Sequence, residues 1–541
     1  MSMYTAVSFA PVQGFIEKSR KLRDLFGASL ILSSLSAKLV EEAETRRLAV
    51  ISPGLPNIKT GMPNRILICG SISQDEVEKL LRNRWEEMLD ICRQWVQEAI
   101  PSRTFVWEEQ WAHWKRHCWE FFWGQGDSVL AAMRSLEAQK LRRGWIGINW
   151  LGESSSLTGT DAIAWHRLGE DTRAPGKPLS SSHKAELEAF YTHLAWILDD
   201  PARRARQPLP DSATIQSLIE ADELGKFIAP NERISIPELV KRLITLPTIA
   251  AKIPIPQLES GFQEIKRDPG CWTGWFMGDG DKVGDKLEQI AQQNGDEGLK
   301  NFSEQMRRWG EDLKSNPNLF PEGKGRVIYA GGDDFLGVLY NHQAGKKVEP
   351  KQAWQWLQDL PQEWMPLQVQ LKKDLSIDYT FSVGFVWAGH QVPQRDILQH
   401  CREAEQQSKL KGRDRLTIRV VFNSGQFIEW TCPWDCLSLL RNYQDREGGQ
   451  NWSHVYSDWQ TLKSRHAIRL RSTKSLPVQS DLAMKLLDFY FDEAAKKIQD
   501  PRHSIDWRYV VGDNDPLAVV QWIDSFIQVG WQLSCCASKL H

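Results

Sequence analysis

The chain has 541 residues, of which 41% are hydrophobic and 10% aromatic, and this composition suits a folded protein of several domains. Its formal net charge of −2 excludes a uniformly basic nucleic-acid binder, so any contact with nucleic acid must use local basic patches. The sequence has no run of eighteen apolar residues, no signal-peptide pattern and no disulfide-like spacing of its nine cysteines. We therefore expect a cytoplasmic protein without a membrane segment.

Residues 1–150 are predicted to form a first α/β domain. Strand-like apolar runs occur at 4–10, 65–69 and 118–123, and a charged helical segment at 75–98 separates the last two. The segment 9–29 has an apolar helical stripe, contains the basic residues Arg20, Lys21 and Arg23, and ends at Ser29. The domain has no acidic strand end and is not expected to bind metal.

Residues 151–255 are predicted to form a mainly helical connecting domain, with helices at 185–198 and 236–246. No cysteine occurs between Cys118 and Cys271. A zinc site requires clustered thiolate or imidazole ligands, so a zinc ribbon is not expected in this domain.

An acidic strand end occurs at 272–284. The apolar run ends in Asp279 and Asp281, which the two-residue alternation of a strand would place on one face. A helical pattern follows at once, so the free N–H groups of a helix N-terminus would lie beside these carboxylates and could hold a phosphate. Gly280 would let a ligand approach the backbone closely.

A second acidic motif lies between the two apolar runs of 327–339. Gly331 and Gly332 predict a tight hairpin because glycine supplies the positive φ that such turns need, and Asp333 and Asp334 follow at its tip. Two carboxylates that converge at a turn could bind a divalent cation, which would relieve their repulsion. The same four residues are also good turn chemistry on an exposed hairpin without a site.

The elements downstream complete an α+β domain at 256–425. We expect a strand at 376–386, a helix with the buried stripe Ile397, Cys401, Ala404 and Ser408, and a final strand at 415–422. We interpret the order as β-α-β-β-α-β, a ferredoxin-like arrangement in which the DGD strand and the GGDD hairpin are neighbours at the sheet centre. Residues 426–541 are predicted to form a C-terminal helical domain.

These motifs together resemble a known family. The DGD strand end, the GGDD hairpin and a later A-x-x-x-S-K helix followed by G-R resemble the second Palm domain in the large subunit of type III CRISPR effector complexes, and the segment 9–29 resembles the start of that subunit in the Cmr, or III-B, subtype. The resemblance implies two ferredoxin-like Palm domains plus helical domains. Many relatives begin with an HD nuclease domain, which we do not expect here because no histidine is followed by aspartate.

The resemblance implies an enzyme that synthesises cyclic oligoadenylates from ATP when the guide RNA pairs with target RNA. Such nucleotidyl transfer needs two cations, Mg²⁺ or Mn²⁺. We assign Asp279, Asp333 and Asp334 as metal ligands, with Asp281 as a fourth. Gly280, Gly331 and Gly332 would admit the nucleotide, and Lys409 matches a phosphate-contacting lysine of the family, although a lysine at a helix C-terminus is also favoured by the helix dipole.

The family also implies the partners. They are the other Cmr subunits (backbone, small and guide 5′-end-capping), the guide RNA and the target RNA. Nucleotides would bind where the two Palm domains face each other, near Ser29, unless Ser29 and the basic residues before it are ordinary capping and surface positions. Two alternatives stay open, an architectural subunit with a silent Palm domain and a diguanylate-type cyclase, because GGDEF enzymes share the fold.

Overall fold

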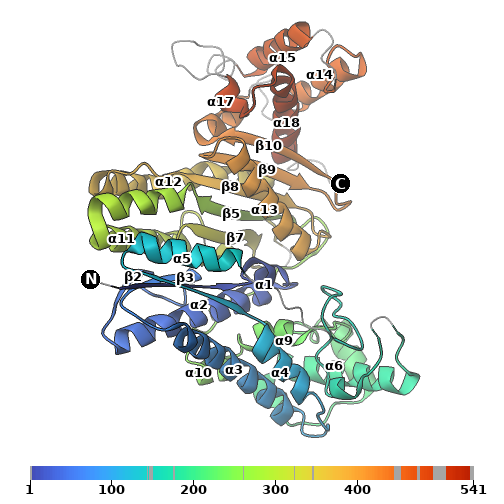
Figure 1. The fold of residues 1–541 in the computed structure, drawn as a ribbon. Coiled ribbons are helices and arrows are strands. Elements are labelled where there is room, and N and C mark those ends of the chain that lie inside the picture. Colours follow the sequence, from blue (N-terminus) through green and yellow to red (C-terminus); the bar gives the residue numbers. More distant parts are fainter. Residues whose placement is uncertain are drawn as a thin grey trace. The chain divides into compact units, whose positions relative to one another are not determined.

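The fold is given by a computed structural model (Figure 1), which describes residues 3–142, 144, 150–174, 177–259, 261–321, 323–343, 346–443, 452–471, 476–491 and 507–535. The chain divides into two units, Met1–Phe262 and Gln263–His541, and each is described by itself. The predicted domains 1–150 and 151–255 lie in the first unit. The predicted C-terminal domain also includes 444–451, 472–475, 492–506 and 536–541, which lie outside the described residues.

The first unit contains an antiparallel sheet in the order β2-β3-β1-β4. With α2 after β1 and α3 after β3, this is the predicted ferredoxin-like order. The strand β2 was missing from the sequence prediction because its four residues are too short for a clear alternation. The elements are β1 (Tyr4–Ala10), α1 (Gln13–Glu17), α2 (Leu22–Thr45), β2 (Ala49–Ser52), β3 (Arg65–Cys69), α3 (Gln74–Ala99), α4 (Glu108–His117), β4 (Glu120–Gly126) and α5 (Val129–Leu141).

Helices follow in the rest of the first unit, as predicted. Helix α9 packs against α2 so closely that a Cβ on Gly27 would lie 1.8 Å from the carbonyl oxygen of Lys241. The elements are η1 (Leu168–Glu170), α6 (Ser181–Asp199), α7 (Pro201–Arg204), α8 (Ser212–Glu220), α9 (Ile236–Leu243) and α10 (Pro247–Lys252).

A buried ion cluster joins these helices to the first sheet domain. The guanidinium of Arg242 donates to Asp24 at 2.7 and 3.0 Å and to Glu232 at 2.9 and 3.0 Å. All three side chains are almost fully buried. Burial raises the pKa of Asp24, but its contacts with Arg242 and with the N–H groups of Lys21 and Arg20 outweigh this and hold the pKa below its usual value. The cluster therefore stays ionised and fixes 232–242 against the start of α2.

The second unit has a six-stranded sheet in the order β10-β9-β8-β5-β7-β6. The strands β5 and β7 are central neighbours, as the sequence predicts, and only β8 and β9 pair in parallel. The elements are β5 (Thr273–Gly280), α11 (Val283–Ser315), β6 (Lys324–Ala330), β7 (Asp334–Asn341), α12 (Pro350–Leu375), β8 (Phe381–Ala388), α13 (Gln394–Leu410), β9 (Arg415–Val421) and β10 (Phe427–Pro433).

Helix α12 corrects the sequence prediction. It is the second helix of the β-α-β-β-α-β unit formed by β5, α11, β6, β7, α12 and β8, whereas α13 and β9 add a further crossover to the sheet. The predicted strand at 376–386 is therefore too early, because Ser376 ends α12 with a left-handed φ of 56° and β8 begins at Phe381.

The two faces of this sheet carry different helices. Phe385 packs against Trp356 of α12, with ring centroids 6.0 Å apart. The next residue along β8, Gly384, faces α13, since a Cβ there would lie 2.5 Å from the Cys401 carbonyl oxygen. Successive strand residues point to opposite faces, so α12 and α13 cover opposite faces of the sheet. The predicted stripe of α13 is buried on that face.

The C-terminal part of the second unit gathers beside β10 (Figure 1). Its strand β10 was predicted as helical, but it forms a hairpin with β9 in which Phe427 pairs with Val421. Helix α18 packs on β10 through Trp522 and Phe526, which contact Trp430. A membrane-spanning helix is not found among the described residues. The elements are η2 (Trp434–Asn442), α14 (Ser453–Ser464), α15 (Leu476–Tyr490), α17 (Trp507–Val511) and α18 (Pro516–Cys535).

Candidate functional site

The two acidic motifs meet at one end of the central strands of the second unit. In the antiparallel pair β5 and β7, Asp279 is the register partner of Asp334, and the Gly280 N–H donates to the carbonyl of Asp333 at 2.9 Å. Directly opposed residues share a face of the sheet. The backbone thus places Asp279 beside Asp334, with Asp333 next to them at the turn, although positions 279 and 333 are 54 apart in the sequence.

The hairpin between β6 and β7 forms where predicted, but not with the predicted backbone conformation. Its turn is closed by the Gly331 N–H, which donates to the Asp334 carbonyl at 3.2 Å. Neither Gly331 nor Gly332 is among the glycines with positive φ, so the expected left-handed turn is wrong. A Cβ at Gly332 would meet no atom within 4 Å. The space beside this turn is therefore open, and the site keeps the room that the sequence analysis expected.

Lys409 lies at the carboxylate of Asp279. Its ammonium group contacts Asp279 Oδ2 and also lies 2.7 Å from Glu405 Oε1. Helix α13 brings the lysine there, because Ser408 is fixed by a hydrogen bond to the Val383 carbonyl at 2.9 Å. Burial raises the pKa of Asp279, and the Lys409 contact opposes that shift. A cation therefore already accompanies this carboxylate.

Asp281 has a different environment from Asp279. The hydroxyls of Thr380 and Ser382 each donate to it at 2.7 Å, and the Asp414 N–H donates at 2.9 Å. Together these donors engage both carboxylate oxygens, and the residue is only 4% exposed. Asp281 thus accepts hydrogen bonds from two loops and a strand.

Asp334 is the carboxylate whose charge is most perturbed. Burial, the Asp333 charge and the Asp279 charge raise its pKa to about 7, while a hydrogen bond from the Tyr329 hydroxyl opposes them. Like charges at close range favour the protonated form because they repel the second negative charge. A cation bound here would offset the repulsion from Asp333 and Asp279 that contributes to that shift.

Helix α11 and the loop before β8 contribute two residues that the sequence analysis did not single out. Arg307 is buried and donates to the carbonyls of Ala330 and Gly331 at 3.3 and 3.1 Å, so it holds the hairpin from behind. The Tyr379 hydroxyl is buried without a hydrogen-bond partner among the described residues, and a Cβ on Gly280 would lie 1.8 Å from it. Gly280 therefore makes room for Tyr379.

The carboxylates suit a hard divalent cation, but they do not form a finished cage. Among the described residues, no three Asp, Glu, His or Cys side chains converge as a ready metal group. Mg²⁺ keeps several waters and is often held by only one or two carboxylates, so a full protein cage is not required. The negative charge that raises the pKa of Asp334 fits a cation at this strand end. The candidate ligands are Asp279, Asp333 and Asp334.

In the first unit, the basic residues before Ser29 have partners within that unit. Lys21 donates to the carbonyls of Gly225 and Lys226 at 3.0 and 2.8 Å, and Arg23 donates to the Thr245 hydroxyl at 3.1 Å. These two side chains therefore fasten α2 to the connecting helices. Ser29 lies half-buried in α2, and its contact with a nucleotide stays a prediction.

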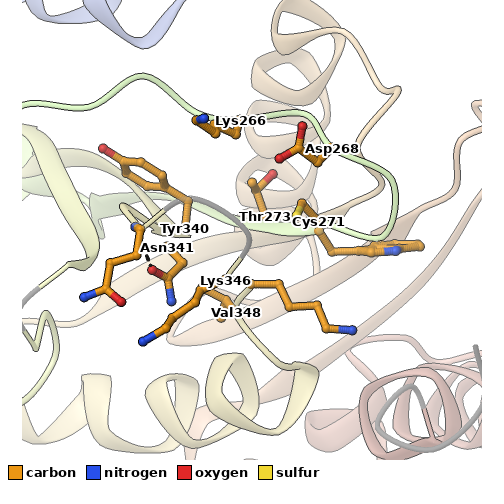
Figure 2. A pocket seen from close by; sticks show the side chains of 11 residues that line it. Lys266, Asp268, Cys271, Thr273, Tyr340, Asn341, Lys346 and Val348 are labelled. Atoms are coloured by element: carbon orange, nitrogen blue, oxygen red, sulfur yellow. Dashed lines mark hydrogen bonds between the residues drawn. The ribbon is translucent and has the colours of Figure 1, made fainter.

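A separate pocket lies at the other end of β5 and β7 (Figure 2). Its wall includes Thr273, where β5 begins, whereas Asp279 is the second-to-last residue of the same strand, which ends at Gly280. Eight strand residues span about 25 Å, so this pocket is distinct from the acidic site. The pocket is lined by Lys266, Asp268, Cys271, Trp272, Thr273, Tyr340, Asn341, Gln343, Lys346, Lys347 and Val348.

Comparisons with known proteins match both units. Residues 4–90 match the family described as CRISPR-associated protein Cmr2, N-terminal, and residues 273–417 match Cas10/Cmr2, second palm domain. No curated protein matches the sequence. A chain in the cryo-EM structure of the type III-B Cmr-beta complex in the apo state is 11% identical, with 98% of this chain and 82% of that chain covered and a TM-score of 0.52.

Two crystal structures of Csm1-Csm4 cassettes are also similar. The one in complex with pppApApA is 13% identical, covers 99% of this chain and 69% of that chain, and has a TM-score of 0.49. The one in complex with one ATP is 14% identical, covers 98% and 70%, and has a TM-score of 0.43. At these TM-scores the likeness does not establish a shared fold.

The Palm-type sheet with acidic strand ends and the two family matches define a large subunit of type III CRISPR effector complexes. The two matched segments, 4–90 and 273–417, both fit models of the Cas10/Cmr2 family.

Proposed function

We propose that this subunit synthesises cyclic oligoadenylates from ATP within a Cmr-type effector complex when the guide RNA pairs with target RNA. The single observation that best supports this proposal is the pairing of Asp279 with Asp334 on the neighbouring strands β5 and β7. Beside this pair, the Gly280 N–H donates to the Asp333 carbonyl. In nucleotidyl transfer the attacking oxygen and the leaving oxygen each require a cation, so several carboxylates must meet at one place. Here those carboxylates come from two separate segments of the chain.

Asp279, Asp333 and Asp334 would hold Mg²⁺ or Mn²⁺, which when bound lowers the pKa of a 3′-hydroxyl and stabilises the pyrophosphate. We leave Asp281 out of this set because three protein donors already engage it. Lys409 would contact a phosphate as a compact cation, and its position beside Asp279 supports that role. The open space at Gly332 would admit the nucleotide.

The partners follow from the same proposal. The subunit would act together with the other Cmr subunits, namely the backbone, small and guide 5′-end-capping subunits. The guide RNA and target RNA would supply the activating signal. Ser29 would contact a nucleotide as well.

The test uses the assembled complex with guide RNA, target RNA and ATP, and chromatography of the products. We expect oligoadenylates from the wild type, none from Asp333→Ala combined with Asp334→Ala, and wild-type amounts from Asp268→Asn, a carboxylate at the opposite end of β5. The proposal fails if the double variant makes the same products. GTP in place of ATP tests the diguanylate alternative, and a wild-type complex without any product would favour an architectural subunit.

A further inference from the structure

The turn between α13 and β9 has an unusual backbone. Gly412, Arg413 and Asp414 have φ values of 127°, 65° and 49°, so three consecutive residues lie in the positive-φ region. Residues other than glycine rarely adopt this conformation and keep it only when their surroundings hold it. Something in the structure must therefore hold this turn, which directly follows the helix that carries Lys409.

Asp281 holds one side of the turn. Its Oδ2 accepts a hydrogen bond from the Asp414 N–H at 2.9 Å, and the Thr380 and Ser382 hydroxyls fix the carboxylate itself at 2.7 Å each. Asp281 is thus a buried acceptor between β8 and the turn. Hydrogen bonds to a charged acceptor are about twice as strong as neutral ones, so this contact can compensate the strained backbone.

The C-terminal segment 509–513 holds the other side. Lys411 forms an ion pair with Asp513 at 2.9 Å, and the buried Arg415 donates to the Val510 carbonyl at 3.0 Å and to the Tyr509 carbonyl. A Cβ on Gly512 would lie 2.1 Å from the Lys411 carbonyl oxygen, so the two backbones are in direct contact. The turn therefore lies between the acidic strand end and the C-terminal segment.

We propose that Asp281 and the segment 509–513 are positioning elements that clamp the α13–β9 turn and thereby set the place of Lys409 beside Asp279. This inference rests on the proposed function, in which Lys409 contacts a nucleotide phosphate. It gives the two acids of the DGD motif different roles: Asp279 belongs to the ligand set, and Asp281 acts through Lys409.

The first test is Asp281→Asn, which keeps the shape but replaces one acceptor oxygen with a donor. Mn²⁺ affinity is measured by electron paramagnetic resonance titration of the protein, and kcat and KM for ATP are measured with the assembled complex. We expect Mn²⁺ affinity within about twofold of wild type and kcat/KM lowered roughly tenfold, with no further loss when Asp281→Asn is added to Lys409→Gln. A loss of Mn²⁺ affinity equal to that of Asp279→Asn, or losses that multiply with Lys409→Gln, would overturn the proposal.

The second test changes the C-terminal side of the turn and leaves the buried Asp281 intact. Asp513→Asn removes the ion pair with Lys411 and is expected to lower kcat/KM about twofold to threefold in the wild-type background and not at all in the Lys409→Gln background. Asp359→Asn, a partly exposed carboxylate on α12, serves as the matched control. Unchanged kcat/KM in Asp513→Asn would show that the segment 509–513 does not position Lys409. A wild-type complex that makes no product would instead contradict the proposed function. Failure of the positioning role and failure of the proposed function are therefore distinguishable.

Discussion

Replacing Asp334 with asparagine should stabilise the metal-free protein at neutral and alkaline pH. The raised pKa of about 7, against an ordinary 3.8, means that the folded state binds more protons than the unfolded state between these values. Stability therefore falls as the pH rises through this window, and the loss is complete above pH 7. At 1.36 kcal/mol per pKa unit, the upper limit of this loss of stability is about 4 kcal/mol. Asp334 is partly exposed to water, so we expect a loss of roughly 1–2 kcal/mol.

The assay is denaturant unfolding of the full chain with a chelator at pH 5 and pH 8. Other titrating groups contribute to both proteins, so the measured quantity is the difference in unfolding free energy between Asp334→Asn and wild type. This difference should be small at pH 5 and favour the variant at pH 8. Asp359→Asn, which changes a partly exposed carboxylate on α12, should show no such change with pH. An equal difference at both pH values would refute the charge repulsion inferred for the hairpin tip.

Three further substitutions test other contacts by thermal unfolding. Tyr379→Phe removes a buried hydroxyl that has no hydrogen-bond partner among the described residues, and it should leave the metal-free protein as stable or about 1 kcal/mol more stable; a loss of 1 kcal/mol or more would show that the hydroxyl has an important partner. Arg307→Gln removes the donors behind the hairpin and should cost about 2 kcal/mol, whereas an unchanged midpoint would contradict its supporting role. Asp24→Asn removes one of the two carboxylates that pair with the buried Arg242 and should cost about 3 kcal/mol, and a loss below 1 kcal/mol would contradict the buried ion cluster.

Local patterns predicted much of the fold. The strands β1 and β3 begin and end at the predicted residues, and the buried stripe of α13 runs as expected from Ile397 to Ser408. These elements have clear apolar periodicity over several residues, and the pattern alone decides between strand and helix. The adjacency of the two acidic motifs was also predictable, because a hairpin and a preceding strand in this order become neighbours in the sheet.

Helix α12 could not be predicted with the same rules. It contains Pro361 and Pro366, and proline within a helix normally removes a backbone hydrogen bond and ends it. Here the buried residues Trp356, Leu360 and Trp364 recur at helical spacing and anchor the helix despite the prolines. Strand β10 had a usable turn signal before it, since Gly425 has a φ of 80° in the hairpin to β9.

The roles of the individual site residues could be assigned only from the structure. Asp279 and Asp281 are equivalent by spacing, but Asp281 is engaged by Asp414, which lies 133 residues away in sequence. Arg307 reaches the hairpin from a helix whose surface pattern does not mark it. Such contacts depend on tertiary packing between distant segments, and a single sequence does not contain the register that creates them.

The central claim is that Asp279, Asp333 and Asp334 together hold divalent cations at the strand end. The most direct measurement is Mn²⁺ binding to the purified protein by electron paramagnetic resonance, for wild type, for each aspartate replaced by asparagine, and for Asp359→Asn. We predict that each of the three substitutions weakens binding at least tenfold and that the control does not. Unchanged Mn²⁺ affinity in all three variants would contradict the account.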